Sequence, residues 1–260
     1  MNVRSASIAT ILLLLLFGWC ENASCQNSPD RFLRWFANDP VDMVSQAGPE
    51  QLLRIASFGA GLSLITLNDA SSSRSIQEVY GSSPFLKFSN EWGNWKIVAP
   101  ISAGIFAGSL LGDNTKFQDA AFTSLQSLLY AKAAANAGKF IFARARPGNR
   151  EGPYDINFVD TDYTSFPSGH TAAAFALVTP WVIYYPGPIT YSLMAIPVGT
   201  GIARIAKGRH WLSDVTAGAA LGFSLAYRLS KKHLDIQSDR VKVIPQAGPD
   251  SFSLRINFLF

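Results

Sequence analysis

The chain has 260 residues, of which 48% are hydrophobic and only 15% are charged. This length is sufficient for one well-buried domain and requires no second one. The formal net charge is +4, and no run of Lys and Arg indicates nucleic acid as a partner. We therefore assign the small excess of positive charge to the surface and to an anion-binding site.

Residues 1–25 have the pattern of a secretory signal peptide. Arg4 supplies the positive start, an apolar or small run covers 8–17, and small residues at 23–25 offer a cleavage site. The run is short for a bilayer span, although an uncleaved anchor helix is the alternative. We expect an exported protein, and cleavage after residue 25 would remove both cysteines and leave no disulfide framework.

Residues 26–50 are polar and contain proline, which predicts a mobile lead-in to a domain at 51–232. Six apolar stretches follow, rich in Ala, Leu, Gly and Ser, at 52–67, 97–112, 119–142, 171–185, 189–206 and 215–229. This composition favours helices over strands, and Asn, Asp, Gly and Pro separate several of the stretches. The sequence therefore predicts an all-α protein built as a six-helix bundle.

The C-terminal extension, 233–260, has a different pattern. Apolar and polar residues alternate at 241–244 and 253–258, and turn-forming residues lie between them. This pattern predicts a short β-hairpin. One hairpin cannot close a membrane barrel, so we expect it to pack on the helices or on a membrane surface.

Lys139 and Arg146 lie seven positions apart. On a single helix they would share one face, about two turns or roughly 10 Å from each other. Pro147 disfavours helical geometry at Arg146, so we expect the helix to fray there and to present the guanidinium at its end. Two cations so placed suit an oxyanion, although ordinary surface charges would show the same spacing.

Pro167-Ser168-Gly169-His170 directly precedes an apolar stretch. Ser168 is a good N-cap and Gly169 permits close approach of the backbone. Free N–H groups at a helix start bind oxyanions, with help from the helix dipole. His170 would then stand at the edge of a bound phosphate, where a general acid is needed.

His210 and Asp214 have the i, i+4 spacing that brings two side chains together on a helix. A carboxylate at one ring nitrogen fixes the imidazole tautomer and leaves the other nitrogen free to attack phosphorus. Arg204 lies six positions before His210 and can bind equatorial oxygens bidentately. The alternative is an ion pair that only stabilises the helix.

Taken in order, the patterns Lys-x6-Arg-Pro (139–147), Pro-Ser-Gly-His (167–170) and Arg-x5-His-x3-Asp (204–214) resemble the signature of the type 2 phosphatidic acid phosphatase (PAP2) superfamily. That superfamily also contains bacterial class A acid phosphatases and vanadium haloperoxidases. The resemblance covers about residues 52–230 and implies a six-helix bundle of the PAP2/haloperoxidase type. One position departs from the pattern, because Ala203 stands where the family usually has Ser, and we expect this to tune activity rather than abolish it.

The resemblance also implies roles for these residues. His210 attacks phosphorus and forms a phosphohistidine, Asp214 orients it, and His170 protonates the leaving alcohol and then activates water. The implied phosphate-binding residues are Lys139, Arg146, Ser168, Gly169 and Arg204. No metal or other cofactor is implied, and the sequence has no carboxylate cluster or multi-histidine spacing to hold a metal.

We therefore expect a metal-independent phosphatase of the bacterial cell envelope that acts on lipid phosphates or pyrophosphates. The expected location is the envelope membrane, with the site facing the periplasm. Six crossings from an exported start would place the site on the wrong side, so whether the helices span the bilayer stays open. The alternatives are a soluble periplasmic acid phosphatase for small phosphomonoesters, a vanadate-dependent haloperoxidase and an inactive scaffold.

Overall fold

The structure is a computed structural model that describes residues 30–45, 48–80, 83–149, 152–159, 164–238, 241–248 and 251–258. The predicted signal peptide at 1–25 lies outside the described residues. The described part is predominantly helical, as predicted. Its elements are α2 (Asp30–Ser45), α3 (Pro49–Thr66), α4 (Asp69–Tyr80), α5 (Pro84–Glu91), α6 (Trp95–Ser109), α7 (Thr115–Phe142), η1 (Pro147–Asn149), α8 (Gly169–Tyr184), α9 (Pro188–Ser192), α10 (Ala195–Ala206), α11 (Leu212–Ser238), β1 (Val241–Gly248) and β2 (Ser251–Phe258).

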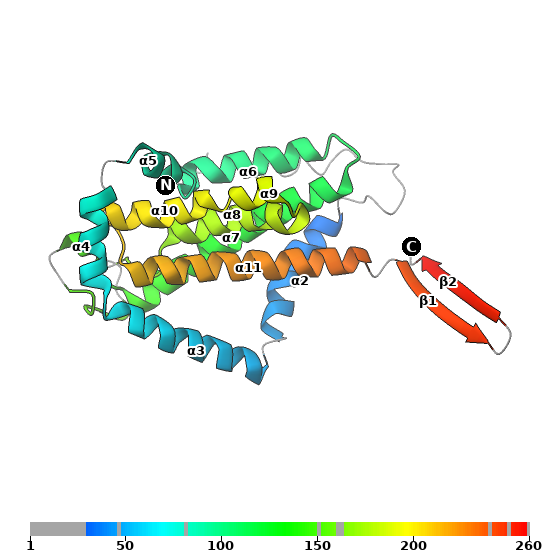
Figure 1. Cartoon of the computed structure of the whole chain (residues 1–260), viewed down its shortest axis with the longest axis horizontal. Coiled ribbons are helices and arrows are strands. Elements are labelled where there is room, and N and C mark those ends of the chain that lie inside the picture. The colour runs from blue at the N-terminus through cyan, green and yellow to red at the C-terminus, as the bar shows by residue number, and fades with distance from the viewer. Residues whose placement is uncertain are drawn as a thin grey trace, which may run out of the picture.

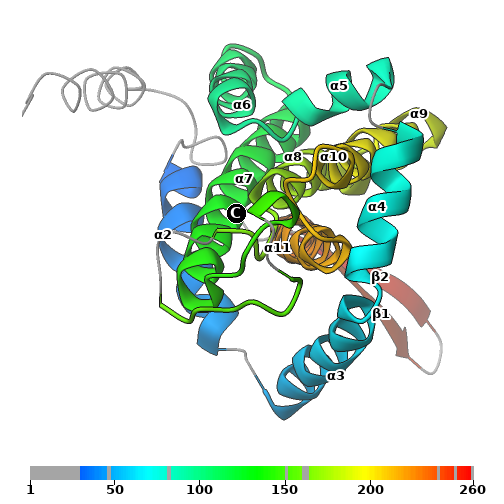
Figure 2. The same ribbon diagram turned by 90° about the vertical axis from the view of Figure 1, so that its left-hand side faces the viewer.

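Helix α8 lies at the centre of the bundle and packs against α7, α10 and α11 (Figure 2). Small side chains make the close packing possible, because they let helix backbones approach one another. Four buried alanines from α7 and α8 form one core cluster, on which two leucines of α11 pack; they are Ala131, Ala135, Ala172 and Ala176, with Leu221 and Leu225. The core therefore depends on small residues as much as on large ones.

The contact between α11 and α8 is especially close at Gly218 and Gly222. A Cβ atom at either position would lie under 3.0 Å from a backbone carbonyl oxygen of α8 or its N-cap, at Ser168 or Ala172. Only glycine fits such an approach. The packing of α11 on α8 thus fixes the start of α8, where the Ser-Gly-His motif lies.

Side chains at the starts of several helices cap free backbone N–H groups. Asn94 caps α6, and Asn114 caps α7 by accepting from Phe117 N.

Helix α4 lies across the end of the bundle at which α7 and α10 finish and α8 and α11 begin (Figure 1). The four chain segments that carry the motifs therefore meet at one end of the molecule, beneath α4.

The prediction of a mobile lead-in at 26–50 was wrong for the part that the structure describes. Residues 30–45 form α2, whose Phe32 and Trp35 are buried against Phe122 of α7. Arg31 donates to the Asp119 carboxylate at 3.0 Å in the same interface. The polar composition misled because the buried polar groups of α2 find partners in the bundle.

Strands β1 and β2 lie in the segment for which the sequence predicts a hairpin. They pair antiparallel, with a register from Val241 opposite Phe258 to Gly248 opposite Ser251. Helix α11 continues to Ser238, past the domain end expected at 232. The two strands extend beyond the end of α11 that is remote from α4 (Figure 1).

Candidate active site

Lys139 lies in the last turn of α7, whereas Arg146 lies in the loop after it. The prediction that both residues share one helix was wrong, because Ala143 adopts a left-handed φ of 36° and α7 ends at Phe142. The two cations nevertheless converge on Thr164. Lys139 Nζ donates to its carbonyl oxygen at 2.5 Å, and Arg146 Nη2 donates to its hydroxyl at 2.9 Å.

Ser168 is the N-cap residue of α8 and Gly169 is the first residue of that helix. The Ser168 hydroxyl does not cap a backbone N–H, because it pairs with Thr171 Oγ1 at 2.9 Å. The Ser168 N–H donates to the carbonyl oxygen of Asp214, which joins the starts of α8 and α11. A Cβ at Gly169 would lie 3.6 Å from Lys139 Cε, so the lysine stem runs across the start of α8.

His170 follows in the first turn of α8 and is half-buried. The turn between α5 and α6 approaches it so closely that a Cβ at Gly93 would lie 2.6 Å from His170 O and 2.8 Å from its Cβ. A larger residue at position 93 would therefore displace the imidazole. Among the residues that the structure describes, backbone packing restricts where His170 can lie, and no side-chain hydrogen bond does so.

His210 and Asp214 meet as expected, although His210 lies just before α11, which begins at Leu212, and only Asp214 lies within its first turn. His210 Nδ1 lies 3.6 Å from Asp214 Oδ2, which is slightly long for a hydrogen bond. Nδ1 has no hydrogen-bond partner among the described residues. Catalytic hydrogen bonds are often long before substrate binds, so the geometry suits a carboxylate that orients the imidazole and leaves Nε2 to react.

Arg204 lies in the last turn of α10 and is held by α5. Its Nη1 donates to Asn90 Oδ1 at 3.2 Å, and the amide of Asn90 in turn donates to Glu91 Oε1 at 3.0 Å. The orientation of the Asn90 amide is thereby fixed, with its oxygen toward the arginine. Sequence patterns gave no sign of this support.

Two of the three predicted cations also have buried donors without partners. Arg146 Nε and Arg204 Nε have no hydrogen-bond acceptor among the described residues. An unsatisfied buried donor is unfavourable by about 1–3 kcal/mol, and more for a charged group. An oxyanion is the ligand that would satisfy both guanidinium groups at once.

Burial changes the protonation of the site. It lowers the pKa of His170 to about 3, and the charges of Arg204 and His210 act in the same direction. Burial likewise lowers the pKa of His210 to about 4, against the opposing effect of Asp214. The pKa of Lys139 falls to about 7, again chiefly through burial. Both imidazoles are therefore neutral near pH 7, and an unprotonated ring nitrogen is what a nucleophile requires.

Arg144 is a site residue that the sequence analysis missed, although it lies two positions before Arg146. Its Nη1 donates to Asp214 Oδ1 at 2.7 Å, and its Nη2 donates to Asp69 Oδ2 at 2.8 Å. The hydroxyl of Ser165 donates to the other oxygen of Asp214. Burial raises the pKa of Asp214, but His210, Arg144 and Ser165 together keep it below the ordinary value of 3.8.

No group of three or more His, Cys, Asp or Glu residues within the described ranges is arranged to hold a metal ion. A cavity of about 210 Å³ lies beside Arg144 and is lined by Thr66, Phe142, Pro153, Tyr154, Ile156 and Phe166. None of the eight predicted site residues lines it. This apolar cavity is therefore distinct from the predicted phosphate site.

Residues 120–237 match the sequence profile of the PAP2 superfamily. The matched segment belongs to the PAP2 superfamily. It contains all eight predicted site residues, so the resemblance carried by the three motifs is confirmed. Asp69 and Asn90, which contact candidate site residues from α4 and α5, lie outside the matched segment.

Two curated relatives match part of the chain. The chain is 43% identical over 90 residues to a lipid A 1-phosphatase of Porphyromonas gingivalis, a stretch that is 34% of this chain and 18% of the relative. It is 30% identical over 105 residues to a lipid A 1-phosphatase of Rhizobium johnstonii, which is 38% of this chain and 43% of the relative. The chain thus spans less than two thirds of the length of either relative.

A similar fold occurs in a transmembrane PAP2-type phosphatidylglycerolphosphate phosphatase from Bacillus subtilis. The TM-score is 0.53, and the match covers 70% of this chain and 96% of that one at 20% sequence identity. At this identity the likeness concerns the fold alone.

Proposed function

We propose that this protein is a metal-independent phosphatase that removes phosphate from phosphorylated lipids at a membrane of the cell envelope, through a phosphohistidine on His210. The observation that carries the proposal is the arrangement of two imidazoles beside the basic side chains of Lys139, Arg146 and Arg204. Phosphoryl transfer depends mainly on positioning and on stabilisation of charge, which such an arrangement supplies.

Phosphate binding is assigned to the cations and to the start of α8. Arg146 and Arg204 have buried Nε donors without partners among the described residues, and the Lys139 stem crosses Gly169. Together they would neutralise the equatorial oxygens of the phosphoryl group, with help from the free N–H groups and the dipole of α8.

His210 acts as the nucleophile. Asp214 faces Nδ1, so the neutral ring would carry its proton there and present the lone pair of Nε2 to phosphorus. Nε2 forms a bond to phosphorus while the bond from phosphorus to the leaving oxygen breaks. The resulting phosphohistidine carries positive charge on the ring, which the Asp214 carboxylate stabilises.

His170 acts as the general acid and then as the general base. In the free protein it is neutral, because burial and neighbouring cations hold its pKa at about 3. A bound phosphate dianion offsets those cations and raises the pKa, so the substrate brings about the protonation that the leaving alkoxide needs. In the second step His170 takes a proton from water, which attacks phosphorus and releases inorganic phosphate and free His210.

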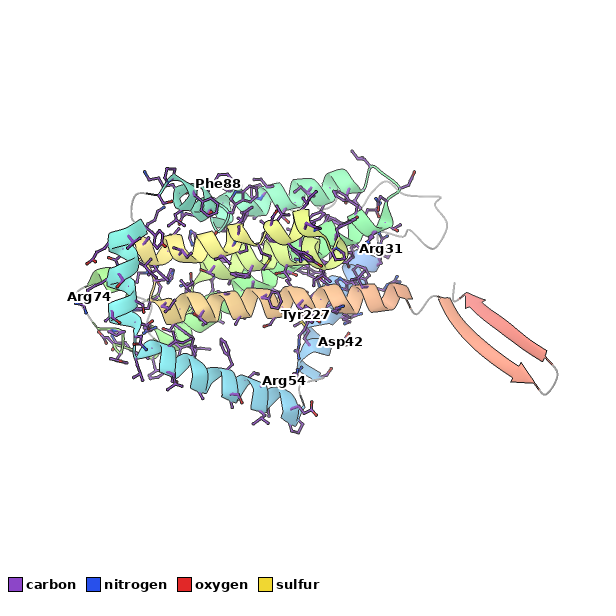
Figure 3. All side chains as sticks on the ribbon, viewed as in Figure 1. Arg31, Asp42, Arg54, Arg74, Phe88 and Tyr227 are labelled. Carbon is purple, nitrogen blue, oxygen red and sulfur yellow. The ribbon has the colours of Figure 1, made fainter. Side chains whose placement is uncertain are left out.

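The lipid substrate and the membrane are supported by the surface of the molecule. Helix α3 diverges from α11 toward the N-terminal end of α3 (Figure 3). None of the residues of α3 is buried. The helix exposes Leu52, Leu53, Ile55, Phe58 and Leu64, and apolar surfaces of this extent mark interaction sites.

Within the described residues one stretch, Pro188–Ala206, is long and apolar enough to cross a membrane, by length and composition only. The two curated relatives are named as lipid A phosphatases, which agrees with a lipid phosphate as substrate.

The test uses the purified full chain with phosphatidate, phosphatidylglycerol phosphate, lipid A bearing its 1-phosphate, and p-nitrophenyl phosphate. We expect phosphate release to be fastest from a lipid substrate and unaffected by EDTA. His210→Gln should lower kcat at least about a thousandfold, because no other group supplies the nucleophile. An acid-labile phosphohistidine should accumulate after rapid quenching of the wild-type protein and be missing in this variant.

Lys116→Gln serves as the control, because Lys116 is an exposed cation near the start of α7, at the end remote from the site. It should keep wild-type kcat. Full activity in His210→Gln would exclude the assigned nucleophile. Hydrolysis of p-nitrophenyl phosphate alone would exclude the lipid substrate and favour the soluble acid phosphatase alternative.

A further inference from the structure

Arg144 lies between the carboxylates of Asp69 and Asp214 in the interior. These three residues and the neighbouring Ser213 are all buried. Each guanidinium nitrogen has an acceptor. Nη2 donates to Asp69 Oδ2 at 2.8 Å, and Nη1 donates to Asp214 Oδ1 and to Ser213 Oγ, both at 2.7 Å. Nε donates to the carbonyl oxygen of Pro153 at 2.7 Å. The guanidinium therefore has one permitted orientation.

Asp69 connects this cluster to the first turn of α11. Its Oδ1 accepts the backbone N–H of Ser213 at 2.8 Å, and its Oδ2 accepts the Ser213 hydroxyl. The N–H groups of a first helical turn have no partner within the helix, so a carboxylate there both caps the helix and interacts favourably with its dipole. Asp69 belongs to α4 and thus ties that helix to the residue directly before Asp214.

The Asp214 carboxylate is fixed by three donors. Arg144 binds Oδ1, while the Trp211 N–H and the Ser165 hydroxyl bind Oδ2. With both oxygens restrained, Oδ2 is held toward His210 Nδ1. Small rotations of this carboxylate would change which imidazole nitrogen carries the proton.

We propose that Asp69 and Arg144 are positioning residues for His210, acting through Asp214. Arg144 sets the plane of the Asp214 carboxylate, and Asp69 compensates the charge of Arg144. Without Asp69, the buried Arg144–Asp214 pair would be neutral overall, and Asp214 would be a weaker partner for a ring that gains positive charge. With Asp69 the cluster has a net charge of −1 beside His210, which stabilises the phosphohistidine and favours the tautomer with the proton on Nδ1. The proposal rests on the proposed role of His210 as nucleophile.

A purely structural ion-pair cluster is the competing explanation, since buried ion pairs are often replaceable without loss of function. Asp69→Asn separates the two explanations, because the amide keeps the shape and one carbonyl acceptor but loses the charge. We expect kcat to fall by about 10- to 100-fold, as for other residues that orient a reactive group, with KM changed by less than about threefold. Ser213→Ala should also lower kcat, but by a smaller factor than Asp69→Asn.

A second readout does not depend on activity. The chain has three histidines, so their ring nitrogens can be resolved by ¹⁵N NMR. At pH 7, wild-type His210 should be mainly the Nδ1–H tautomer, and Asp69→Asn should increase the share of the Nε2–H tautomer. His233, which is buried at the other end of α11 between Asp39 and Thr123, reports whether the variant is folded. If wild type proves to have no phosphatase activity, the tautomer of His210 still decides whether Asp69 positions it.

Asp119→Asn is the matched control. Asp119 is likewise a buried carboxylate in an ion pair with an arginine, Arg31, but it lies near the start of α7, whereas Lys139 lies at its end. It should lower Tm without changing kcat or the His210 signals. The proposal would be overturned if Asp69→Asn, like Asp119→Asn, lowered Tm but left kcat and the His210 signals unchanged. If Asp69→Asn does not fold, Ser213→Ala decides, and wild-type kcat with wild-type His210 signals in that variant would overturn it equally.

Discussion

The two imidazoles of the site differ in what surrounds them. His210 has the Asp214 carboxylate at Nδ1, whereas the leading charge effects on the pKa of His170 come from basic groups, first of all Arg204. A ring next to a carboxylate tolerates the positive charge of a phosphohistidine. A ring among cations takes up a proton only when a phosphate offsets them. This asymmetry is the physical reason to assign attack to His210 and proton transfer to His170.

Lys139 is expected to make phosphate binding pH-dependent. Its pKa is lowered to about 7 by burial, and a bound oxyanion favours the charged amine. The favourable interaction is therefore fully present below pH 7 and is lost as the pH rises above it, by up to about tenfold in affinity per pH unit. The measurement is the inhibition constant of inorganic phosphate between pH 6 and 9.

Lys139→Arg is the comparison, because arginine stays charged throughout this range. The ionisation of phosphate itself is common to both proteins, so the ratio of their inhibition constants isolates the lysine. A ratio that does not change with pH would show that Lys139 keeps its proton, and would contradict the lowered pKa.

Eight candidate site residues could be named from sequence because the proposed chemistry requires particular side chains at short spacings along the chain. The residues that hold these side chains in place could not be predicted in this way. Ser213 and Asp69 are 144 positions apart, and Arg204 and Asn90 are 114 apart. Such partners are determined by how α4 and α5 pack on the bundle, and a local pattern contains no information about that packing.

At the level of the elements, the site depends on how closely α11 approaches α8. Composition predicted the helices themselves, since each of the six apolar stretches contains or overlaps a helix of the structure. The end of α7 was predicted too late, because the left-handed conformation of Ala143 has no signal in an alanine. The close contact at Gly218 and Gly222 also required coordinates, since glycine within a helix normally only weakens it.

Gly222→Ala should therefore destabilise the protein. The added Cβ would lie under 3.0 Å from Ala172 O, so α8 and α11 must move apart, at a cost of about 1–3 kcal/mol. The free energy of unfolding measured in urea tests this expectation. Because the start of α8 moves as well, kcat should fall.

Gly104→Ala is the matched control in α6, where an added Cβ meets nothing within 4 Å. It should stabilise the protein by about 0.5–1 kcal/mol through the better helix propensity of alanine. Equal effects at the two positions would mean that α8 and α11 are not in close contact.

At the scale of the whole molecule, α2 is joined to the end of the bundle remote from the active site. Asp39 of α2 is buried and pairs with His233 Nε2 at 2.9 Å and Lys232 Nζ at 2.8 Å. Trp35 stacks on the His233 ring, with centroids 3.8 Å apart. The polar residues that suggested a mobile segment are thus the groups that attach it.

Asp39→Ala should lower stability by about 3 kcal/mol, because it leaves the buried His233 without its carboxylate. The site lies at the other end, so kcat of the folded protein should stay within about twofold of wild type. Thermal unfolding and activity at low temperature measure the two quantities. Asp42→Ala removes a more exposed carboxylate that pairs with the same residue, Lys232, and should change Tm little. If Asp42→Ala lowered Tm as much as Asp39→Ala, the loss of stability would instead reflect surface charge in general.

The position of Asp69 and Asn90 also limits how this protein can be shortened or recombined. A fragment made from residues 120–237 alone would retain every motif residue but leave Arg144 with one carboxylate instead of two, and Arg204 without its amide support. The smallest unit able to fold with an intact catalytic centre must begin before α4. Chimeras that exchange only the signature-bearing half between relatives should accordingly lose turnover unless the matching α4 and α5 are exchanged with it.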